Sequence, residues 1–326
     1  MRWSRSPSPD RPEDWSDQQL EAAYRAVDLA DGETADAADR ALRADRIAAE
    51  LLRRHPEDQV LWFDRAMLAK WRRDWPAARE LGLRALEMVP EDEREDEPAA
   101  WNLGIAATAL RDWATARRAW RAYGITIAGE GSDPVSEALG VVPVRLNPPP
   151  RFVGRREVEV DGRAWETEVV WGDRLDPARV QLVNVPLPTS GHRHGDVVLH
   201  DGDVHGTRLL EGAEIPVFEE IELWARSPRP TLSVVVTAAD DDVDELLTAL
   251  DAEGLAAEDW TASVRSLCRA CSEGSPGDHD HPFGGGAADD RTIGLSGDRD
   301  DAERIIAGWR RAGAGRDCGE VTVELE

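Results

Sequence analysis

A seven-residue segment recurs with two changes 38 residues later, and this repeat constrains the fold more than any other feature of the sequence. The first copy is Arg73-Asp74-Trp75-Pro76-Ala77-Ala78-Arg79, and the second is Arg111-Asp112-Trp113-Ala114-Thr115-Ala116-Arg117. Each copy follows one apolar segment with helical periodicity and precedes another. We therefore expect a repeating unit made of a helix, a turn and a second helix.

The same periodicity predicts antiparallel pairs of helices throughout residues 16–128, after a disordered lead-in at residues 1–15. Prolines and a glycine, at Pro56, Pro90 and Gly124, mark where successive pairs end. The expected helices are 18–30 and 35–54, then 59–72 and 75–88, then 98–110 and 113–123.

Large residues at the start of each unit, small residues where its two helices cross and an aromatic residue after the turn resemble the tetratricopeptide repeat family. The matching positions are Trp62, Ala66, Trp75, Ala78, Ala85 and Pro90 in one unit, and Asn102, Leu103, Gly104, Trp113, Ala116 and Trp120 in the next. Alanine and glycine at the crossing allow close approach, while tryptophans fill the space between pairs. The resemblance covers about residues 58–124 and is weaker over 16–56. A generic array of helical hairpins is the alternative.

The resemblance implies a concave groove, lined by the first helix of each unit, that binds a peptide or a partner protein. The residues expected on this surface are Phe63, Met67, Lys70, Trp101, Ile105 and Thr108. An apolar groove with one positive charge would suit a hydrophobic peptide or one with an acidic terminus. The alternative is that other parts of the chain cover this surface, because a short solenoid needs capping.

Helical periodicity ends in a segment rich in glycine and proline, residues 129–151, which we interpret as a linker. A period-two pattern follows and predicts a small β module over residues 152–228. Two Asp-Gly pairs, Asp161-Gly162 and Asp201-Gly202, indicate tight hairpins. The expected strands are 157–160, 163–171, 180–185, 196–200, 204–210 and 217–224.

The last part of the chain, residues 229–326, alternates strands with amphipathic helices. The expected elements are a strand at 231–238, a helix at 241–253, strands at 260–267 and 291–295, a helix at 300–312 and a strand at 320–325. This βαββαβ order is the ferredoxin-like arrangement, although residues 260–267 would also suit a helix. The expected fold class is therefore multidomain, α + (α+β).

Two cysteines and two histidines in the C-terminal module form a candidate zinc site. Cys268 and Cys271 precede His279 and His281, which places soft thiolate and borderline imidazole ligands within 14 residues. Only one residue separates the histidines, which is closer than in most zinc fingers. A site that uses all four ligands would be structural, because no coordination position remains for water. An acidic, glycine-rich loop beside two ordinary thiols is the alternative.

A second histidine-rich segment runs from His192 to His205 and contains four of the seven histidines. Because it also holds Asp196, Asp201 and Asp203, a metal-dependent hydrolase that uses this cluster is one interpretation. The expected strand and tight turn favour a histidine-rich surface hairpin instead. The same residues would also suit the lining of a small-ligand pocket.

Charge and composition exclude several classes of protein. The formal net charge of −26, from 65 acidic and 39 basic residues, would repel nucleic acids and anionic membranes. Lys70 is the only lysine and has no glycine-rich loop near it, which argues against a P-loop enzyme, a protein kinase and a pyridoxal enzyme. No apolar run is long enough for a signal peptide or a membrane span, so we expect a cytoplasmic location.

These observations favour a non-enzymatic adaptor or regulator that binds a protein or peptide through its helical repeat. A structural zinc ion in the cysteine and histidine loop is the one cofactor that the sequence indicates. A metal-dependent hydrolase and a small-ligand sensor are the alternatives, because no motif in the chain specifies a reaction.

Overall fold

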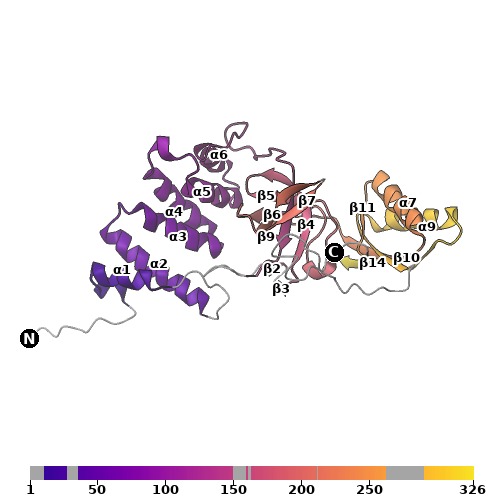
Figure 1. Ribbon diagram of the computed structural model, residues 1–326, viewed down its shortest axis with the longest axis horizontal. Helices are drawn as coiled ribbons and strands as arrows, with labels where there is room; N and C mark the ends of the chain where they lie inside the picture. The colour runs from indigo at the N-terminus through magenta and orange to yellow at the C-terminus, as the bar shows by residue number, and fades with distance from the viewer. Residues whose placement is uncertain (1–10, 28–35, 150–158, 161–162, 211, 262–289) are drawn as a thin grey trace, which may run out of the picture. The chain divides into compact units, whose positions relative to one another are not determined.

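The computed structural model describes residues 11–27, 36–149, 159–160, 163–210, 212–261 and 290–326. The N-terminal half is helical and the C-terminal half is rich in β-strands, as expected (Figure 1). Two compact units make up the chain: residues 1–136 with 149–157, and residues 137–148 with 158–326. None of the helices in the described ranges combines the length and the apolar character that crossing a membrane requires.

The first unit contains three successive helical hairpins, drawn in indigo to purple in Figure 1. Their helices are α1 (Asp17–Arg25) and α2 (Ala37–Arg54), α3 (Gln59–Trp71) and α4 (Trp75–Glu87), and α5 (Pro98–Ala109) and α6 (Trp113–Ala122). The bounds of α2 to α6 agree with the expected ones to within two residues, whereas α1 ends earlier than expected. Hydrophobic periodicity therefore predicted this unit correctly.

The repeated segment forms the same turn in both copies. Arg73 adopts the left-handed backbone conformation (φ 58°) that reverses the chain after α3. The N–H of Asp74 bonds back to the carbonyl of Ala69 (2.9 Å), and the carboxylate of Asp74 accepts the N–H of Ala77 (3.3 Å). The second copy makes the same bonds with Arg111 (φ 60°), Asp112, Ala107 and Thr115. A single turn sequence thus ends one helix and caps the next.

The arginine that ends each copy of the repeat forms hydrogen bonds with a segment that follows its hairpin. Arg79 donates from Nη1 to Asp112 Oδ2 (2.7 Å), the capping residue of the following turn. Arg117 occupies the same repeat position in the last hairpin. Its guanidinium instead donates to three backbone carbonyls, those of Ala128 (3.1 Å), Gly131 (2.9 Å) and Pro134 (3.2 Å). The segment after α6 therefore caps the array at the place where another hairpin would pack.

Close packing of α5 against α6 depends on Gly104. A Cβ at this position would lie 2.6 Å from the ring of Trp120, which is fully buried. The edge of Trp120 also meets Trp101, with ring centroids 5.1 Å apart. Glycine at residue 104 therefore leaves the space that the large indole fills.

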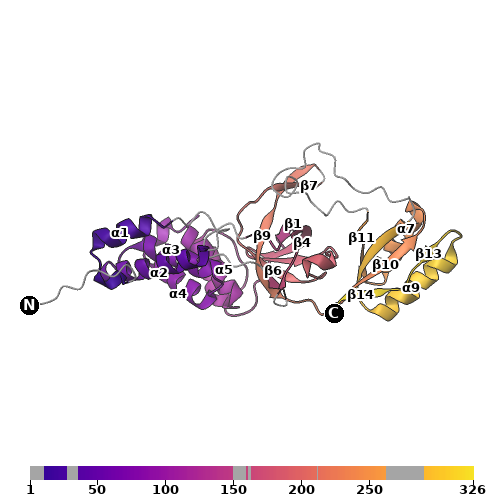
Figure 2. The same ribbon diagram turned by 90° about the horizontal axis from the view of Figure 1, so that it is seen from below.

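The second unit begins with a closed barrel of strand order β1-β4-β5-β6-β9. The barrel strands are β1 (Val141–Leu146), β4 (Glu168–Asp176), β5 (Arg179–Leu182), β6 (Val197–His200) and β9 (Phe218–Ala225). Neighbouring strands are antiparallel except β1 and β9, whose parallel pairing closes the barrel. Two short hairpins stand outside it: β2 (Glu159–Val160) with β3 (Arg163–Ala164), and β7 (Thr207–Leu210) with β8 (Ala213–Pro216). Figure 2 shows β7 set off from β1, β4 and β6.

Two expectations about this region were wrong and one was confirmed. The range 129–151, interpreted as a linker, contains β1, a strand of the barrel. No hairpin forms at Asp201-Gly202, because β6 pairs with β5 and β9 while β7 pairs with β8. The hairpin expected around Asp161-Gly162 is present, since Val160 pairs with Arg163. Both errors concern a strand, β1 or β6, that pairs with β9 rather than with a neighbour across a tight turn.

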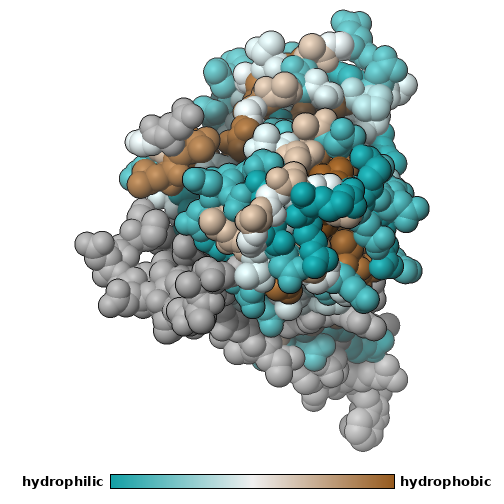
Figure 3. Space-filling view, turned by 90° about the vertical axis from the view of Figure 1, so that its right-hand side faces the viewer, coloured by the Kyte–Doolittle hydropathy of each residue, from teal (hydrophilic) through white to brown (hydrophobic). Residues whose placement is uncertain are grey.

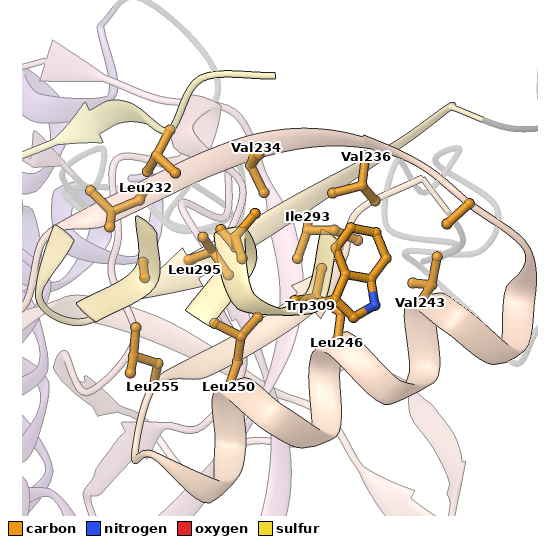
Figure 4. Packing of buried hydrophobic residues seen from close by; sticks show 14 residues of the cluster. Leu232, Val234, Val236, Val243, Leu246, Leu250, Leu255, Ile293, Leu295 and Trp309 are labelled. Carbon is orange, nitrogen blue, oxygen red and sulfur yellow. The ribbon is translucent and has the colours of Figure 1, made fainter. Parts of the chain in front are cut away.

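The rest of the second unit is an α+β module, in which the described residues form five strands and two helices. Its elements are β10 (Thr231–Thr237), α7 (Asp240–Ala252), β11 (Ala256–Asp259), β12 (Asp290–Ser296), α9 (Arg299–Ala312), β13 (Asp317–Cys318) and β14 (Thr322–Leu325). The sheet is antiparallel, with order β11-β12-β10 followed by β13 and β14 along the other edge of β10. Figure 4 shows side chains of β10 and β12 packed against Leu246, Leu250 and Trp309 of the helices.

The second strand of this module lies earlier than expected. It ends at Asp259, before the expected start at Trp260, and residues 262–267 are outside the described ranges. A Cβ at Gly294 of β12 would collide with the indole of Trp260. Trp260, the first residue of the expected strand, therefore packs on the sheet from just beyond the end of β11.

We predict that Gly104→Ala destabilises the helical unit by about 1–3 kcal/mol, because the added Cβ meets the rigid indole of Trp120. The matched control is Gly82→Ala in α4, where the new Cβ would be 3.5 Å from Leu103, an ordinary contact. This control should be neutral or more stable by up to about 1 kcal/mol, since alanine favours a helix. Urea unfolding followed by the helical circular dichroism signal measures both. Equal effects of the two variants would contradict the packing described for Trp120.

Candidate functional site

The residues expected to line a groove on the first helices divide into two groups. Phe63, Met67 and Trp101 are partly exposed. Lys70 is 3% exposed, and Ile105 and Thr108 are both fully buried, so these three offer almost no surface to a partner.

Lys70 makes contacts inside the helical unit. Its ammonium donates to Asn102 Oδ1 (2.8 Å) and lies 4.2 Å from the ring centroid of Trp71. Asn102 belongs to α5. The ammonium of Lys70, which was expected to bind a peptide, therefore links α3 to α5 instead. The function of the surface formed by Phe63, Met67 and Trp101 stays a prediction.

A pocket of about 260 Å³ lies between α4, α5 and α6. Its lining is apolar at Leu83, Leu86, Leu103 and Ala122 and charged at Arg94, Arg118 and Glu87. The pocket thus lies between the second helices of two successive hairpins, α4 and α6, beside α5. Sequence reasoning missed it because the family resemblance pointed to the first helices.

The two arginines of this pocket are held by only a few bonds. Arg94 donates from Nε to the carbonyl of Val89 (2.9 Å), and Arg118 donates from Nη2 to Thr115 Oγ1 (3.0 Å). Within the part of the chain that the structure describes, the other guanidinium nitrogens of Arg118 make no hydrogen bond or ion pair. A guanidinium has five donors, so Arg118 can also pair with a carboxylate ligand.

A larger pocket, of about 690 Å³, runs along α9 beside residues 316–321. Three of its four arginines have carboxylate partners: Arg299 with Glu303 (2.8 Å), Arg310 with Asp317 (2.8 Å), and Arg316 with Asp242 (2.6 Å) and Glu245 (2.6 Å). In the space-filling view of Figure 3, hydrophilic residues predominate and separate the hydrophobic ones into small patches. Most of the arginines that line this pocket are therefore already paired with carboxylates of the chain.

The candidate zinc ligands Cys268, Cys271, His279 and His281 lie outside the described residues. A zinc ion at this loop stays a prediction.

His192, from the histidine-rich segment, is an internal ion-pair partner. It is fully buried, with Nε2 3.1 Å from Glu220 Oε2 and Nδ1 3.4 Å from Asp196 Oδ2. Burial alone lowers the pKa of this imidazole, but the charge of Glu220 and hydrogen bonds with Asp196 and Glu220 outweigh burial and raise the pKa to about 9. Arg226 also donates to Asp196 Oδ2 (2.8 Å). This network stabilises the barrel and leaves no access for a substrate.

The other histidines of this segment do not converge on one point with His192. His200 is fully buried and stacks on Phe218, with ring centroids 4.6 Å apart. His194 is partly exposed and bonds through Nδ1 to the carbonyl of Val183 (3.1 Å). The arrangement that a hydrolase would need, with several histidines around one ion, is therefore not formed by these three residues.

Asp201, Asp203 and His205 do come together. One ligand atom from each lies within 4.8 Å of the others, and no other group of three or more histidine, cysteine or acidic residues in the described ranges meets this geometry. Glu219 of β9 faces the same point, with Oε2 3.8 Å from His205 Nε2. Imidazole and carboxylate ligands together suit divalent transition metals. The alternation Asp-x-Asp-x-His was the signal in the sequence, but the expected hairpin would have directed these side chains differently.

Comparisons with known proteins give no family for the chain. No protein-family model matches the sequence, and neither a search of curated proteins nor one of solved structures found a significant similarity. The geometry of the chain's own residues is therefore the basis for a functional proposal.

We predict that the β-rich unit loses stability as the pH rises from neutral to alkaline values. The pKa of His192 is about 9 in the folded protein and 6.5 when unperturbed, so its stabilisation is complete below pH 6.5 and lost as the pH passes 9. The shift corresponds to a loss on the order of 3 kcal/mol. Urea unfolding between pH 6 and 10, followed by the β-sheet circular dichroism signal, measures it.

The matched variants for this pH profile are His192→Gln and His194→Gln. Glutamine at residue 192 should lower stability at neutral pH and flatten the alkaline decline, because nothing at that site titrates. Glutamine at residue 194 should leave the decline in place, since burial lowers the pKa of His194. An equally steep decline in the His192 variant would show that another group causes it.

Proposed function

We propose that the protein is a non-enzymatic adaptor or regulator whose helical unit is a tetratricopeptide-like module that binds a peptide. The support comes from the repeated turn and from the pocket between α4, α5 and α6. It also comes from two equivalent arginines: Arg79 bonds to the next turn, and Arg117 bonds to the segment after the last hairpin. The strand order of the C-terminal module fits the ferredoxin-like arrangement, which hosts many functions and adds no functional constraint.

The observation that carries the proposal is that leucines and two arginines line one pocket. Leu83 and Ala122 are partly exposed there and form an apolar surface that a ligand side chain can cover. Arg118 is exposed beside this surface and can form paired hydrogen bonds with a carboxylate. An apolar side chain next to an acidic residue or a C-terminal carboxylate matches both features.

The negative charge of the whole chain makes this pocket differ from most of the surface in its affinity for an acidic ligand. A net charge of −26 disfavours acidic peptides over most of the surface, so an acidic ligand depends on local arginines. The volume of about 260 Å³ would accommodate one apolar side chain rather than a folded domain. We therefore propose a short linear peptide as the ligand.

The test is selection from a displayed library of random peptides, followed by affinity measurement on the enriched sequences. We expect peptides with an apolar residue beside an acidic one, and a decrease in affinity of about tenfold or more for Arg118→Glu. The control is Arg43→Glu, the same charge change at an exposed position of α2 outside the pocket. Similar losses in both variants would mean that only long-range charge matters, and absence of any enrichment would contradict the proposal.

A further inference from the structure

We propose that Asp201, Asp203 and His205 bind a divalent transition-metal ion where the β-barrel closes, with Glu219 contributing to the same site. The geometric basis is that imidazole and carboxylate ligand atoms of the first three residues all lie within 4.8 Å of one another. This site is separate from the cysteine and histidine loop, and it does not depend on peptide binding by the helical unit.

The two buried carboxylates of the site each direct one oxygen toward His205. Asp201 Oδ1 accepts the N–H of Asp203 (3.1 Å), and its Oδ2 is 3.7 Å from His205 Nε2. Glu219 Oε1 accepts from Arg145 Nη1 (2.6 Å), and its Oε2 is 3.8 Å from the same imidazole nitrogen. Metal bonds of about 2.0–2.2 Å place ligand atoms roughly 3–4 Å apart, so these separations fit a shared ion better than hydrogen bonds.

The imidazole of His205 supplies an independent indication. Its Nε2 is shielded from solvent and has no hydrogen-bond partner among the described residues. The whole side chain is only 13% exposed. The backbone is fixed on both sides, because the N–H of His205 donates to the carbonyl of Val217 (2.8 Å) and its own carbonyl accepts from Arg145 Nη2 (3.1 Å). A buried nitrogen without a partner is costly, and coordination of a metal ion satisfies it.

The ligand set indicates the class of ion. One imidazole nitrogen with two or three carboxylate oxygens suits Zn²⁺ or Mn²⁺ better than Ca²⁺, which takes oxygen ligands. Asp203 is exposed, whereas Asp201 is 1% exposed and Glu219 is fully buried, so an ion can enter from the side of Asp203. The strongly negative charge of the chain also favours cations at the surface.

The position of the site determines what the ion does. Asp201 follows β6 directly, His205 precedes the β7–β8 hairpin, and Glu219 is in β9 beside β1. An ion bound by these residues connects the end of β6 to β9 and fixes the base of the hairpin. Because the ligands come together only in the folded barrel, binding stabilises the second unit by mass action.

The experiment titrates Zn²⁺ and, separately, Mn²⁺ into the chelator-treated full-length chain. A Cys268→Ser/Cys271→Ser background removes the other predicted metal site. Elemental mass spectrometry after dialysis counts bound ions, and thermal unfolding reports the stabilisation. We expect one ion per chain and a rise in Tm that increases with metal concentration.

The matched variants are Asp203→Asn and Asp173→Asn, both at exposed positions of the same barrel unit. Asp203→Asn should weaken binding at least tenfold, as the loss of a ligand requires, while Asp173→Asn should bind as tightly as the parent. His205→Gln should also lose binding, and the exposed Asp203 variant keeps the test valid if that protein folds poorly. Retention of the ion by Asp203→Asn and His205→Gln, or no binding of either metal by the parent, would overturn the proposal.

Discussion

The buried ion pair between Arg145 and Glu219 is the interaction on which the β-barrel depends. The two side chains are 1% and 0% exposed, and Arg145 Nη1 lies 2.6 Å from Glu219 Oε1. The pair sits at the parallel seam of β1 and β9, where these same residues are direct neighbours. Since an unpaired charge in this position would be strongly unfavourable, the seam and the ion pair require each other. Arg145 also holds the carbonyl of His205, so closing the barrel brings the proposed metal ligands to their places.

Arginine plays a comparable role elsewhere in the chain. Arg79 joins one hairpin to the turn of the next, and Arg117 binds three carbonyls of the capping segment. Each guanidinium offers several donors in a planar arrangement, which lets one side chain satisfy several acceptors that an ammonium group would meet less well. The only lysine, Lys70, is itself buried against Asn102 and Trp71. The chain has 65 acidic residues. Arginines that donate several hydrogen bonds at once help to satisfy its buried carboxylate and carbonyl oxygens.

Local sequence signals predicted the helical unit well and the barrel poorly, for a physical reason. The turn at Arg73 and Asp74 is made of bonds within a few residues, so the sequence displays it directly. In contrast, β1 pairs with β9, and Arg145 lies 74 residues from Glu219, so no local pattern reveals that 141–146 is a core strand. The same limit explains the candidate sites: the Asp201-Gly202 turn signal placed Asp203 and His205 in a hairpin, and the family resemblance placed Lys70 on a groove surface. The peptide pocket depends on how two hairpins cross, which periodicity does not specify.

The most direct test of this account is a double-mutant cycle on Arg145 and Glu219. The unfolding free energies of the parent, Arg145→Met, Glu219→Gln and the double variant would be measured in urea after treatment with a chelator. Each single change should cost about 3–5 kcal/mol because it leaves a buried polar partner unpaired, and the double variant should lose much less than the sum. Losses that add to within about 0.5 kcal/mol would contradict the central role of this ion pair in closing the barrel.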